Sequence, residues 1–297
     1  MKLNKVIIVL GEPNSIFSEI LFKYFKSKNF KNIKQKLILI GCKSLLEEQM
    51  KILNFNFKLN EIEKIKDCKK KMINIINVDY KYKKAFSKID SSSNSYIENC
   101  FRTSLKVIKK KKNIALLNGP ISKKHFLKKK FLGITEYLKN KTKSSKSTML
   151  IYNKKFSVSP LTTHIPINKV SKNISKQKIV ENVNQINNFY LKKIKKKPKM
   201  AILGLNPHCE SVDKRSEESK YIIPAIKILK KKRVTIDGPF STDTFFIKEN
   251  IKKYDVTIGM YHDQVLTPFK TLFKFNAINV TCGLPFIRVS PDHGINS

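Results

Sequence analysis

The sequence predicts an α/β protein with a largely parallel β-sheet, and three observations lead to this fold class. Short apolar runs recur along the chain, each ends in a polar turn, and helical spacing of apolar residues follows. The runs lie at 6–10, 36–40, 114–117, 200–205 and 256–260. Continuous apolar strands that alternate with helices are typical of a parallel sheet buried on both faces.

The first two runs each lead into a predicted helix. The run 6–10 ends in Gly11-Glu-Pro, and a helical stretch follows at 19–25. The run 36–40 ends in Gly41, and apolar residues with helical spacing follow over 45–53. The next segment, 54–99, is polar and gives no clear assignment.

The other three runs end in turns that carry polar and titratable side chains. These turns are Asn118-Gly-Pro, Asn206-Pro-His208 and Tyr261-His-Asp-Gln264. Because parallel sheets of α/β proteins bind ligands beyond the carboxyl ends of their strands, a ligand is expected at these turns.

The charge of the chain is extreme, but it does not by itself indicate nucleic-acid binding. Among 297 residues, 61 Lys and Arg face 22 Asp and Glu, which gives a formal net charge of +39, yet only four residues are arginine. Base-edge and bidentate phosphate recognition favour arginine over lysine. We therefore expect the lysines to be solvated and no nucleic acid to bind. The rival interpretation, a non-catalytic basic nucleic-acid-binding protein, predicts lysines gathered on one face.

The length of the chain and its cysteines further limit the kind of protein that this sequence can encode. A chain of 297 residues suggests about two domains. The five cysteines are widely spaced and form no Cys-x-x-Cys pair, which fits a reducing cytoplasm. The apolar run 6–10 is too short for a signal peptide, and no stretch approaches the ~20 apolar residues of a membrane span. A cytoplasmic protein without a membrane partner is expected.

Three of the five histidines come directly after predicted strands: His164, His208 and His262. Three imidazoles that converge on one crevice would form a catalytic metal site of the zinc type. The alternative is that each is an ordinary hydrogen-bonded turn residue, because spacing alone does not show convergence.

Charged residues accompany these turns. Asp263 follows His262, and Asp243 lies in Gly238-Pro-Phe-Ser-Thr-Asp243; either carboxylate could orient a metal-bound imidazole or accept a proton, with helix capping as the alternative. Arg288 lies in an apolar segment rich in Pro and Gly, and it is a better candidate for an anion clamp than a lysine in a run, with a surface salt bridge as the alternative.

Several common enzyme motifs are absent from the sequence. It has no Gly-x-Gly-x-x-Gly after a strand, no P-loop and no Gly-x-Ser-x-Gly elbow. A conventional Rossmann fingerprint, a P-loop nucleotide site and an α/β-hydrolase are therefore not indicated.

Taken together, the motifs resemble the 4-hydroxythreonine-4-phosphate dehydrogenase family of pyridoxal phosphate biosynthesis. They follow one another in the family's order from residue 11 to residue 294. The matching pieces are Gly11-Glu-Pro, Asn118-Gly-Pro-Ile-Ser-Lys123, Gly133-Ile-Thr-Glu136, Thr163-His-Ile-Pro166, Gly204-Leu-Asn-Pro-His208, Gly238-Pro-Phe-Ser-Thr-Asp243, Met260-Tyr-His-Asp-Gln264, Pro268-Phe-Lys270 and Gly283-Leu-Pro-Phe-Ile-Arg288-Val-Ser-Pro-Asp-His-Gly294.

The resemblance implies two α/β domains around a cleft, as in isocitrate and isopropylmalate dehydrogenases. We expect the first domain at 1–125 with 265–297 and the second at 126–264. It also implies NAD-dependent oxidation of 4-phosphooxy-L-threonine and decarboxylation to 3-amino-2-oxopropyl phosphate, with NAD bound outside a Rossmann motif.

The resemblance further implies a site at a homodimer interface that draws on both subunits. A divalent metal (Zn, Mg or Co) would be held by His164, His208 and His262. The implied contacts of the small phosphorylated substrate are Thr135, Ile134, Lys270, Asn279 and Arg288.

The chain departs from the family pattern at three places. Ile134 stands where the family usually has His, which removes a substrate hydrogen bond and motivates an alternative, a sister dehydrogenase for 4-phosphoerythronate or 4-phosphothreonate. Other residues replace the usual continuations after Asn206-Pro-His208 and after Gly11-Glu-Pro. Family members also continue beyond the end of this sequence at Ser297, so a truncated chain is expected.

Overall fold

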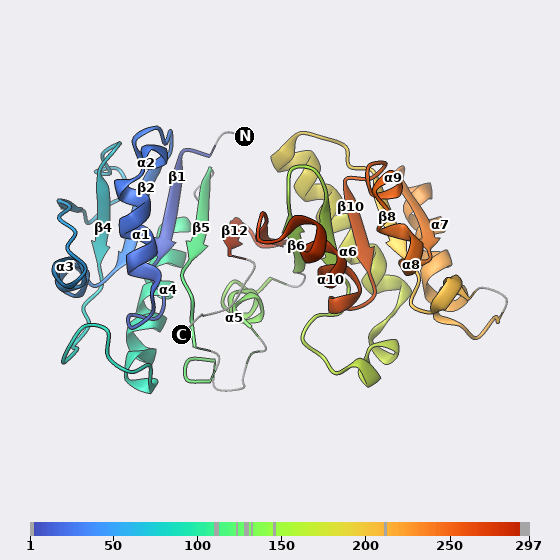
Figure 1. Cartoon of the computed structure of the whole chain (residues 1–297), viewed down its shortest axis with the longest axis horizontal. Helices are drawn as coiled ribbons and strands as arrows, with labels where there is room; N and C mark the ends of the chain where they lie inside the picture. Colours follow the sequence, from blue (N-terminus) through green and yellow to red (C-terminus); the bar gives the residue numbers. More distant parts are fainter. Residues whose placement is uncertain are drawn as a thin grey trace. The chain divides into compact units, whose positions relative to one another are not determined.

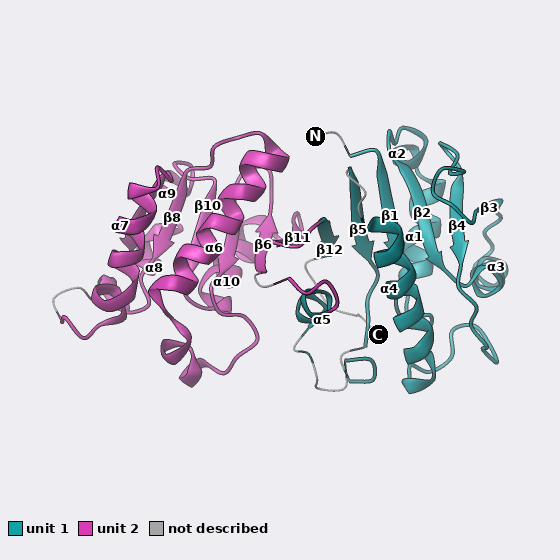
Figure 2. Ribbon diagram, turned by 180° about the vertical axis from the view of Figure 1, so that it is seen from behind, with its two compact units in different colours: residues 1–140, 286–297 teal, residues 141–285 magenta. Residues whose placement is uncertain are grey.

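The structure is a computed structural model, and it describes residues 3–109, 113–122, 124–127, 131, 133–144, 147–210 and 213–291. The chain divides into two compact units (Figures 1 and 2). Unit 1 contains Met1–Asn140 and Phe286–Ser297, and unit 2 contains Lys141–Pro285. The return of the last residues to unit 1 makes that unit discontinuous in sequence.

Unit 1 is a parallel sheet with helices on both faces. The strand order is β3-β4-β2-β1-β5-β12, and every pair is parallel. The strands are β1 (Lys5–Val9), β2 (Lys36–Gly41), β3 (Leu59–Glu61), β4 (Ile73–Asn77), β5 (Ile114–Asn118) and β12 (Ile287–Ser290). The helices are α1 (Phe17–Lys26), α2 (Lys28–Lys31), α3 (Lys43–Ile52), η1 (Ser91–Ser93), α4 (Asn94–Ile108) and α5 (Ile134–Lys141).

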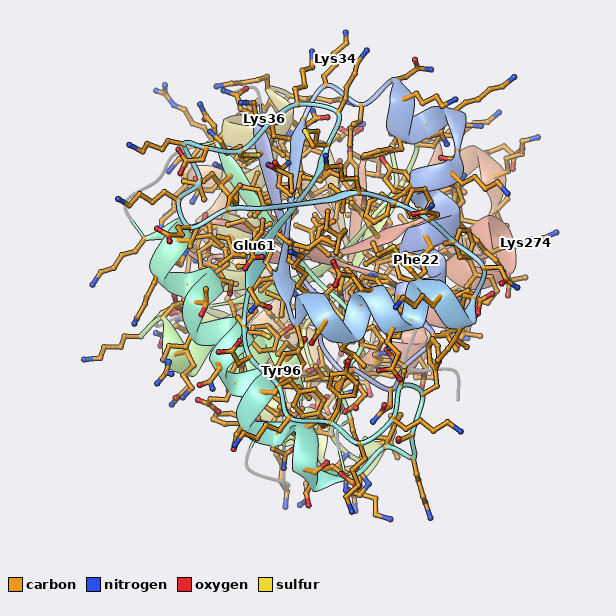
Figure 3. The ribbon with its side chains drawn as sticks, turned by 90° about the vertical axis from the view of Figure 1, so that its left-hand side faces the viewer. Phe22, Lys34, Lys36, Glu61, Tyr96 and Lys274 are labelled. Atoms are coloured by element: carbon orange, nitrogen blue, oxygen red, sulfur yellow. The ribbon has the colours of Figure 1, made fainter. Side chains whose placement is uncertain are left out.

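The core of unit 1 follows from the two faces of its strands. Alternate residues such as Ile8 and Leu39 pack against Phe22 of α1 and Leu46 of α3. Helix α4 covers the other face, in front of the sheet in Figure 2. Figure 3 shows Phe22 within the unit and Lys34 pointing away from it. Burial of these large apolar side chains supplies the main stabilisation, at about 1.5–3 kcal/mol for each one.

Unit 2 is a mixed sheet in the order β11-β6-β7-β10-β8-β9. Strands β7, β10, β8 and β9 are parallel, and β6 is antiparallel to both of its neighbours. The strands are β6 (Thr148–Tyr152), β7 (Ser157–Pro160), β8 (Met200–Leu203), β9 (Ile236–Phe240), β10 (Val256–Gly259) and β11 (Ile278–Cys282).

The helices of unit 2 also lie on both faces of its sheet. They are η2 (Ile167–Lys169), η3 (Ser171–Asn173), α6 (Lys176–Phe189), η4 (Tyr190–Ile194), η5 (Pro207–Cys209), η6 (Glu218–Ile222), α7 (Ile223–Lys231), α8 (Thr242–Phe245), α9 (Lys248–Ile251) and α10 (His262–Phe273). Figure 2 shows α6 and α7 in front of the sheet of unit 2. On the face with α10, Val265 and Phe269 pack against Val158 and Ala201.

The α/β fold class predicted from the sequence is confirmed. All five predicted apolar runs form strands, the strand predicted before His164 is β7, and the two helices predicted after the first runs are α1 and α3. The antiparallel strands β6 and β11 were not predicted, and the unassigned segment 54–99 contains β3, β4 and the start of α4. Among the described residues, no helix combines the length and the apolar content that crossing a membrane requires.

The compact units divide the chain at other points than the predicted domains. Residues 126–140 lie with unit 1, and residues 265–285 lie with unit 2. The placement of residues 265–285 in unit 2 has a clear physical cause. Helix α10 contributes Phe269 to the apolar core of unit 2, and β11 pairs with β6 over its whole length.

Candidate active site

The carboxyl ends of β7 and β10 bring two of the predicted histidines together. The pairing of these parallel strands continues past their ends, since the Leu161 amide donates to the Gly259 carbonyl at 2.8 Å. The Thr162 amide and hydroxyl both donate to the Met260 carbonyl, at 3.1 and 2.7 Å. Two residues further on in each segment, the rings of His164 and His262 lie with their centroids 5.7 Å apart.

A carboxylate accompanies this pair. His262 is the first residue of α10, and its Nδ1 lies 2.9 Å from Oδ1 of Asp263. With the proton on Nδ1, the imidazole donates to the carboxylate and keeps the lone pair of Nε2 for a ligand. A hydrogen bond from the second ring nitrogen to a carboxylate is the usual support of a metal-binding histidine.

His208 lies at the end of β8, in the neighbourhood of Asp243. It is exposed and has a left-handed backbone with φ 55°. The Asp243 carboxylate accepts hydrogen bonds from the Ser241 hydroxyl at 2.6 Å and the Thr244 amide at 2.8 Å. These two bonds and the charge of His208 outweigh desolvation and lower the pKa of Asp243. Asp243 therefore stabilises the first turn of α8 through hydrogen bonds and also interacts with the charge of His208.

One copy of the chain does not assemble the three histidines. Among the residues that the structure describes, no group of three or more His, Cys, Asp or Glu side chains is arranged to hold a metal ion. The structure thus places His164 beside His262 and places His208 with Asp243 instead.

The turn that carries His208 is held by a carboxylate that the sequence patterns did not single out. Glu218 is fully buried, and its Oε1 accepts from the amides of Leu205 and Asn206 at 2.6 and 2.9 Å. Its Oε2 accepts from the Asn206 side-chain amide at 2.8 Å. Three bonds to one carboxylate determine the backbone just before Pro207 and His208. No local motif links Glu218 to a turn twelve residues earlier, so only its rarity in an acid-poor chain could have drawn attention to it.

Two predicted substrate residues also lie in unit 2. The Lys270 ammonium lies 5.4 Å from the ring centroid of Phe275. Asn279 on β11 has a buried Oδ1 with no hydrogen-bond partner among the described residues. A buried acceptor without a partner is costly, so this oxygen is suited to accept a hydrogen bond from a ligand.

Unit 1 contains three of the predicted substrate residues, and one of them is a buried arginine. Arg288 on β12 is 1% exposed, and its Nε donates to Oδ1 of Asn118 at 2.9 Å. Burial lowers the pKa of Arg288 to about 10, although the negative charge of Glu136 opposes this shift. Thr135 and Ile134 form the start of α5, next to Glu136 in sequence, and both are half-buried.

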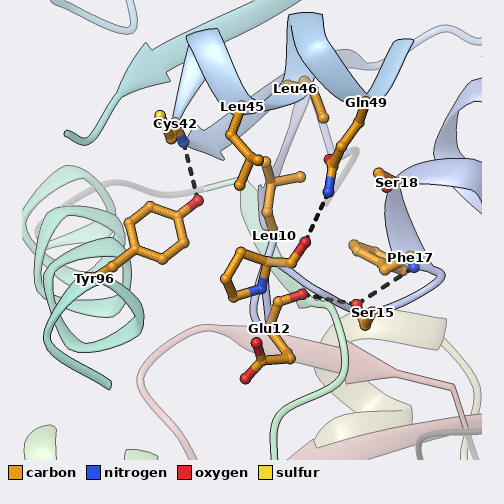
Figure 4. A pocket seen from close by; sticks show the side chains of 11 residues that line it. Leu10, Glu12, Ser15, Phe17, Ser18, Cys42, Leu45, Leu46, Gln49 and Tyr96 are labelled. Carbon is orange, nitrogen blue, oxygen red and sulfur yellow. Dashed lines mark hydrogen bonds between the residues drawn. The ribbon is translucent and has the colours of Figure 1, made fainter. Parts of the chain in front are cut away.

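A pocket in unit 1 lies beyond the carboxyl ends of β1 and β2, and Glu12 and Pro13 of the Gly11-Glu-Pro turn line it (Figure 4). Its Glu12 is 2% exposed, and burial raises the pKa of that carboxyl. The hydrogen bonds that the carboxyl accepts from Asn14 and Ser93 act in the opposite direction and lower the pKa, but by less. The lining residues are Leu10, Glu12, Pro13, Ser15, Phe17, Ser18, Cys42, Leu45, Leu46, Gln49 and Tyr96.

Two α/β units with titratable side chains at their strand ends have the architecture of α/β proteins that bind small molecules beyond the carboxyl ends of their strands. The family model described as "Pyridoxal phosphate biosynthetic protein PdxA" matches residues 33–296. The chain therefore belongs to the PdxA family, an oxidoreductase family of pyridoxal phosphate biosynthesis.

Similar proteins carry two related names. The chain is 37% identical to a 4-hydroxythreonine-4-phosphate dehydrogenase from Sulfurihydrogenibium sp., over 98% of this chain and 90% of that protein. It is 30% identical to a D-threonate 4-phosphate dehydrogenase from Salmonella typhimurium, over 99% and 92% of the two chains. A crystal structure of 4-hydroxythreonine-4-phosphate dehydrogenase from Klebsiella pneumoniae matches with TM-score 0.85 and 25% identity, over 98% of this chain and 91% of that one.

Proposed function

We propose that this protein is an NAD-dependent dehydrogenase that oxidises 4-phosphooxy-L-threonine and decarboxylates the product to 3-amino-2-oxopropyl phosphate. The relatives named 4-hydroxythreonine-4-phosphate dehydrogenase support this substrate. The observation that carries the proposal is the pair of His164 and His262 at adjoining strand ends, with Asp263 on the second nitrogen of His262.

His164, His208 and His262 are the proposed ligands of a divalent metal. Their chemistry fits, because imidazole suits zinc and cobalt, and Asp263 supplies the outer hydrogen bond that such a ligand uses. When bound, the ion supplies Lewis-acid chemistry at the alcohol oxygen of the substrate. Since one copy brings together two of the three histidines, we propose that a homodimer completes the set.

The remaining proposed contacts match an anionic, phosphorylated hydroxy-amino acid. Lys270 and Arg288 supply positive charge for the phosphate and the carboxylate. Asn279 offers its open Oδ1 to a substrate donor such as the ammonium or the hydroxyl group. Thr135 supplies a hydroxyl at the start of α5. Each of these residues binds or orients the substrate and leaves the hydride transfer to the nicotinamide.

The test is an assay of the purified full-length protein with NAD and 4-phosphooxy-L-threonine. We expect NADH and carbon dioxide to form in equal amounts, and we expect the reaction to stop after treatment with a chelator and to resume when Zn²⁺ or Co²⁺ is added. Failure to form NADH with any divalent ion would contradict the proposal.

A second substrate deserves a direct comparison because of Ile134. The chain also resembles a D-threonate 4-phosphate dehydrogenase at 30% identity, and Ile134 stands where the resemblance implies a substrate-binding histidine. In this alternative the protein oxidises 4-phosphothreonate or 4-phosphoerythronate. Side-by-side kcat/KM values for the three compounds decide between the substrates.

A further inference from the structure

Gln264 is a buried side-chain amide whose hydrogen bonds reach three different strand ends. It is 6% exposed and lies in the first turn of α10. Its Oε1 accepts from the Met260 amide at 2.6 Å, after β10. Its Nε2 donates to the Gly204 carbonyl at 2.7 Å, after β8, and to the Thr242 hydroxyl at 2.9 Å, after β9.

Each of these three partners lies close in sequence to a candidate active-site residue. Met260 precedes His262 by two residues, Gly204 precedes His208 by four, and Thr242 is next to Asp243. Strands β10, β8 and β9 are neighbours in the sheet of unit 2. A single side chain therefore connects the three turns that carry these candidates.

The neighbouring residues keep this amide in one orientation. Both donors and the carbonyl oxygen of the amide are used, so a rotated amide would place donor against donor and acceptor against acceptor. The backbone also approaches closely, since a Cβ on Gly259 would lie 2.9 Å from Oε1 of Gln264 and 2.5 Å from Val265. A glycine at this position is what allows the contact.

We infer that Gln264 is a positioning residue of the active site. It holds the turns after β8, β9 and β10 in one arrangement, so that His208, Asp243 and His262 keep their relative places although His208 and Asp243 are exposed and His262 is only half-buried. The inference rests on the proposed function for its catalytic meaning, whereas the coupling of the three turns depends only on the hydrogen bonds of Gln264.

The first experiment measures hydrogen–deuterium exchange in full-length Gln264→Met, which keeps the side-chain length and removes all three bonds. The matched control is Gln49→Met. Gln49 is 3% exposed and donates to the Pro13 carbonyl at 2.7 Å in unit 1. We expect the segments 204–210 and 241–246 to exchange at least about ten-fold faster in Gln264→Met, together with 260–264, and to be unchanged in Gln49→Met.

The second experiment titrates the same proteins with Co²⁺ and records its absorption spectrum. Gln264→Met is expected to bind Co²⁺ about ten-fold more weakly with an altered spectrum, as for other residues that support metal ligands indirectly, and Gln49→Met is expected to match wild type. Wild-type affinity in Gln264→Met, or faster exchange confined to 260–264, would overturn the inference. If the wild-type protein bound no metal, the proposed metal chemistry would fail, and the exchange data would still decide whether Gln264 couples the turns.

Discussion

The candidate groups of the two units are held in opposite ways. In unit 2, His164, His208 and Asp243 are exposed at strand ends, and buried side chains such as Gln264 and Glu218 hold the turns that carry them. In unit 1, Arg288 is itself the buried group, and it is bonded directly to Asn118. In unit 2, the buried residues that hold the turns are thus different from the exposed candidate residues. In unit 1, the candidate residue Arg288 is itself buried.

This difference predicts how substitutions separate activity from stability. Removing an exposed side chain leaves the fold intact, because little buried area or hydrogen bonding is lost. Removing a buried, hydrogen-bonded cation leaves unsatisfied polar groups in the interior. Variants of the exposed residues in unit 2 should therefore lose activity without losing stability, whereas variants of the buried Arg288 in unit 1 should lose both.

The largest effect is expected for His262→Ala in unit 2. Loss of a proposed metal ligand should reduce kcat/KM by roughly a thousand-fold, since Lewis-acid stabilisation contributes several kcal/mol. The melting temperature of the metal-free protein should stay within a few degrees of wild type. His125→Ala in unit 1 is the control and should keep its activity. Full activity in His262→Ala would remove the basis for a metal site at these strand ends.

A smaller effect, on both stability and substrate affinity, is expected for Arg288→Lys in unit 1. Lysine lacks the Nε–H that reaches Asn118, so the variant should lose about 1–3 kcal/mol of unfolding free energy as well as substrate affinity. Chemical denaturation and KM measure the two losses. Arg102→Lys, at an exposed position, is the control and should change neither. An Arg288→Lys protein of wild-type stability would break the contrast between the units.

Substrate preference should respond to Ile134→His at the start of α5. The new imidazole adds one hydrogen bond of about 1 kcal/mol to the substrate for which the family's histidine is implied. We therefore expect kcat/KM for 4-phosphooxy-L-threonine to rise about five-fold relative to that for 4-phosphothreonate, with Ile134→Val unchanged. An unchanged ratio in both variants would show that Ile134 does not set the preference.

The smallest effect concerns Glu12, the buried carboxyl of the unit 1 pocket. Its pKa is raised above the usual 4.5 by burial, so the folded state holds the proton more tightly than the unfolded state does. The associated stability is present below about pH 4.5 and is lost as pH rises through the raised value. Relative to Glu12→Gln, the melting temperature of the wild type should therefore fall over the pH range that begins at about pH 4.5. A constant difference across this range would contradict the assignment.

Much of the fold could be predicted from local patterns. The run 36–40 became β2 and the run 256–260 became β10, because a continuous apolar strand has few alternatives to a buried parallel sheet. The antiparallel β6 and β11 were missed, since their pairing depends on contacts between segments about 130 residues apart. The histidines could be singled out as residues after strands, but the role of Gln264 could not.

The sequence by itself determined the fold class, the family and the scarce polar residues at the strand ends, because periodicity and motif order are local or linear properties. Only the tertiary structure decided which of those residues meet. It placed His164 beside His262 and His208 near Asp243, and it buried Arg288 against Asn118. The physical reason is that these contacts join separate strands, whose register and side-chain directions are set by packing of the whole sheet.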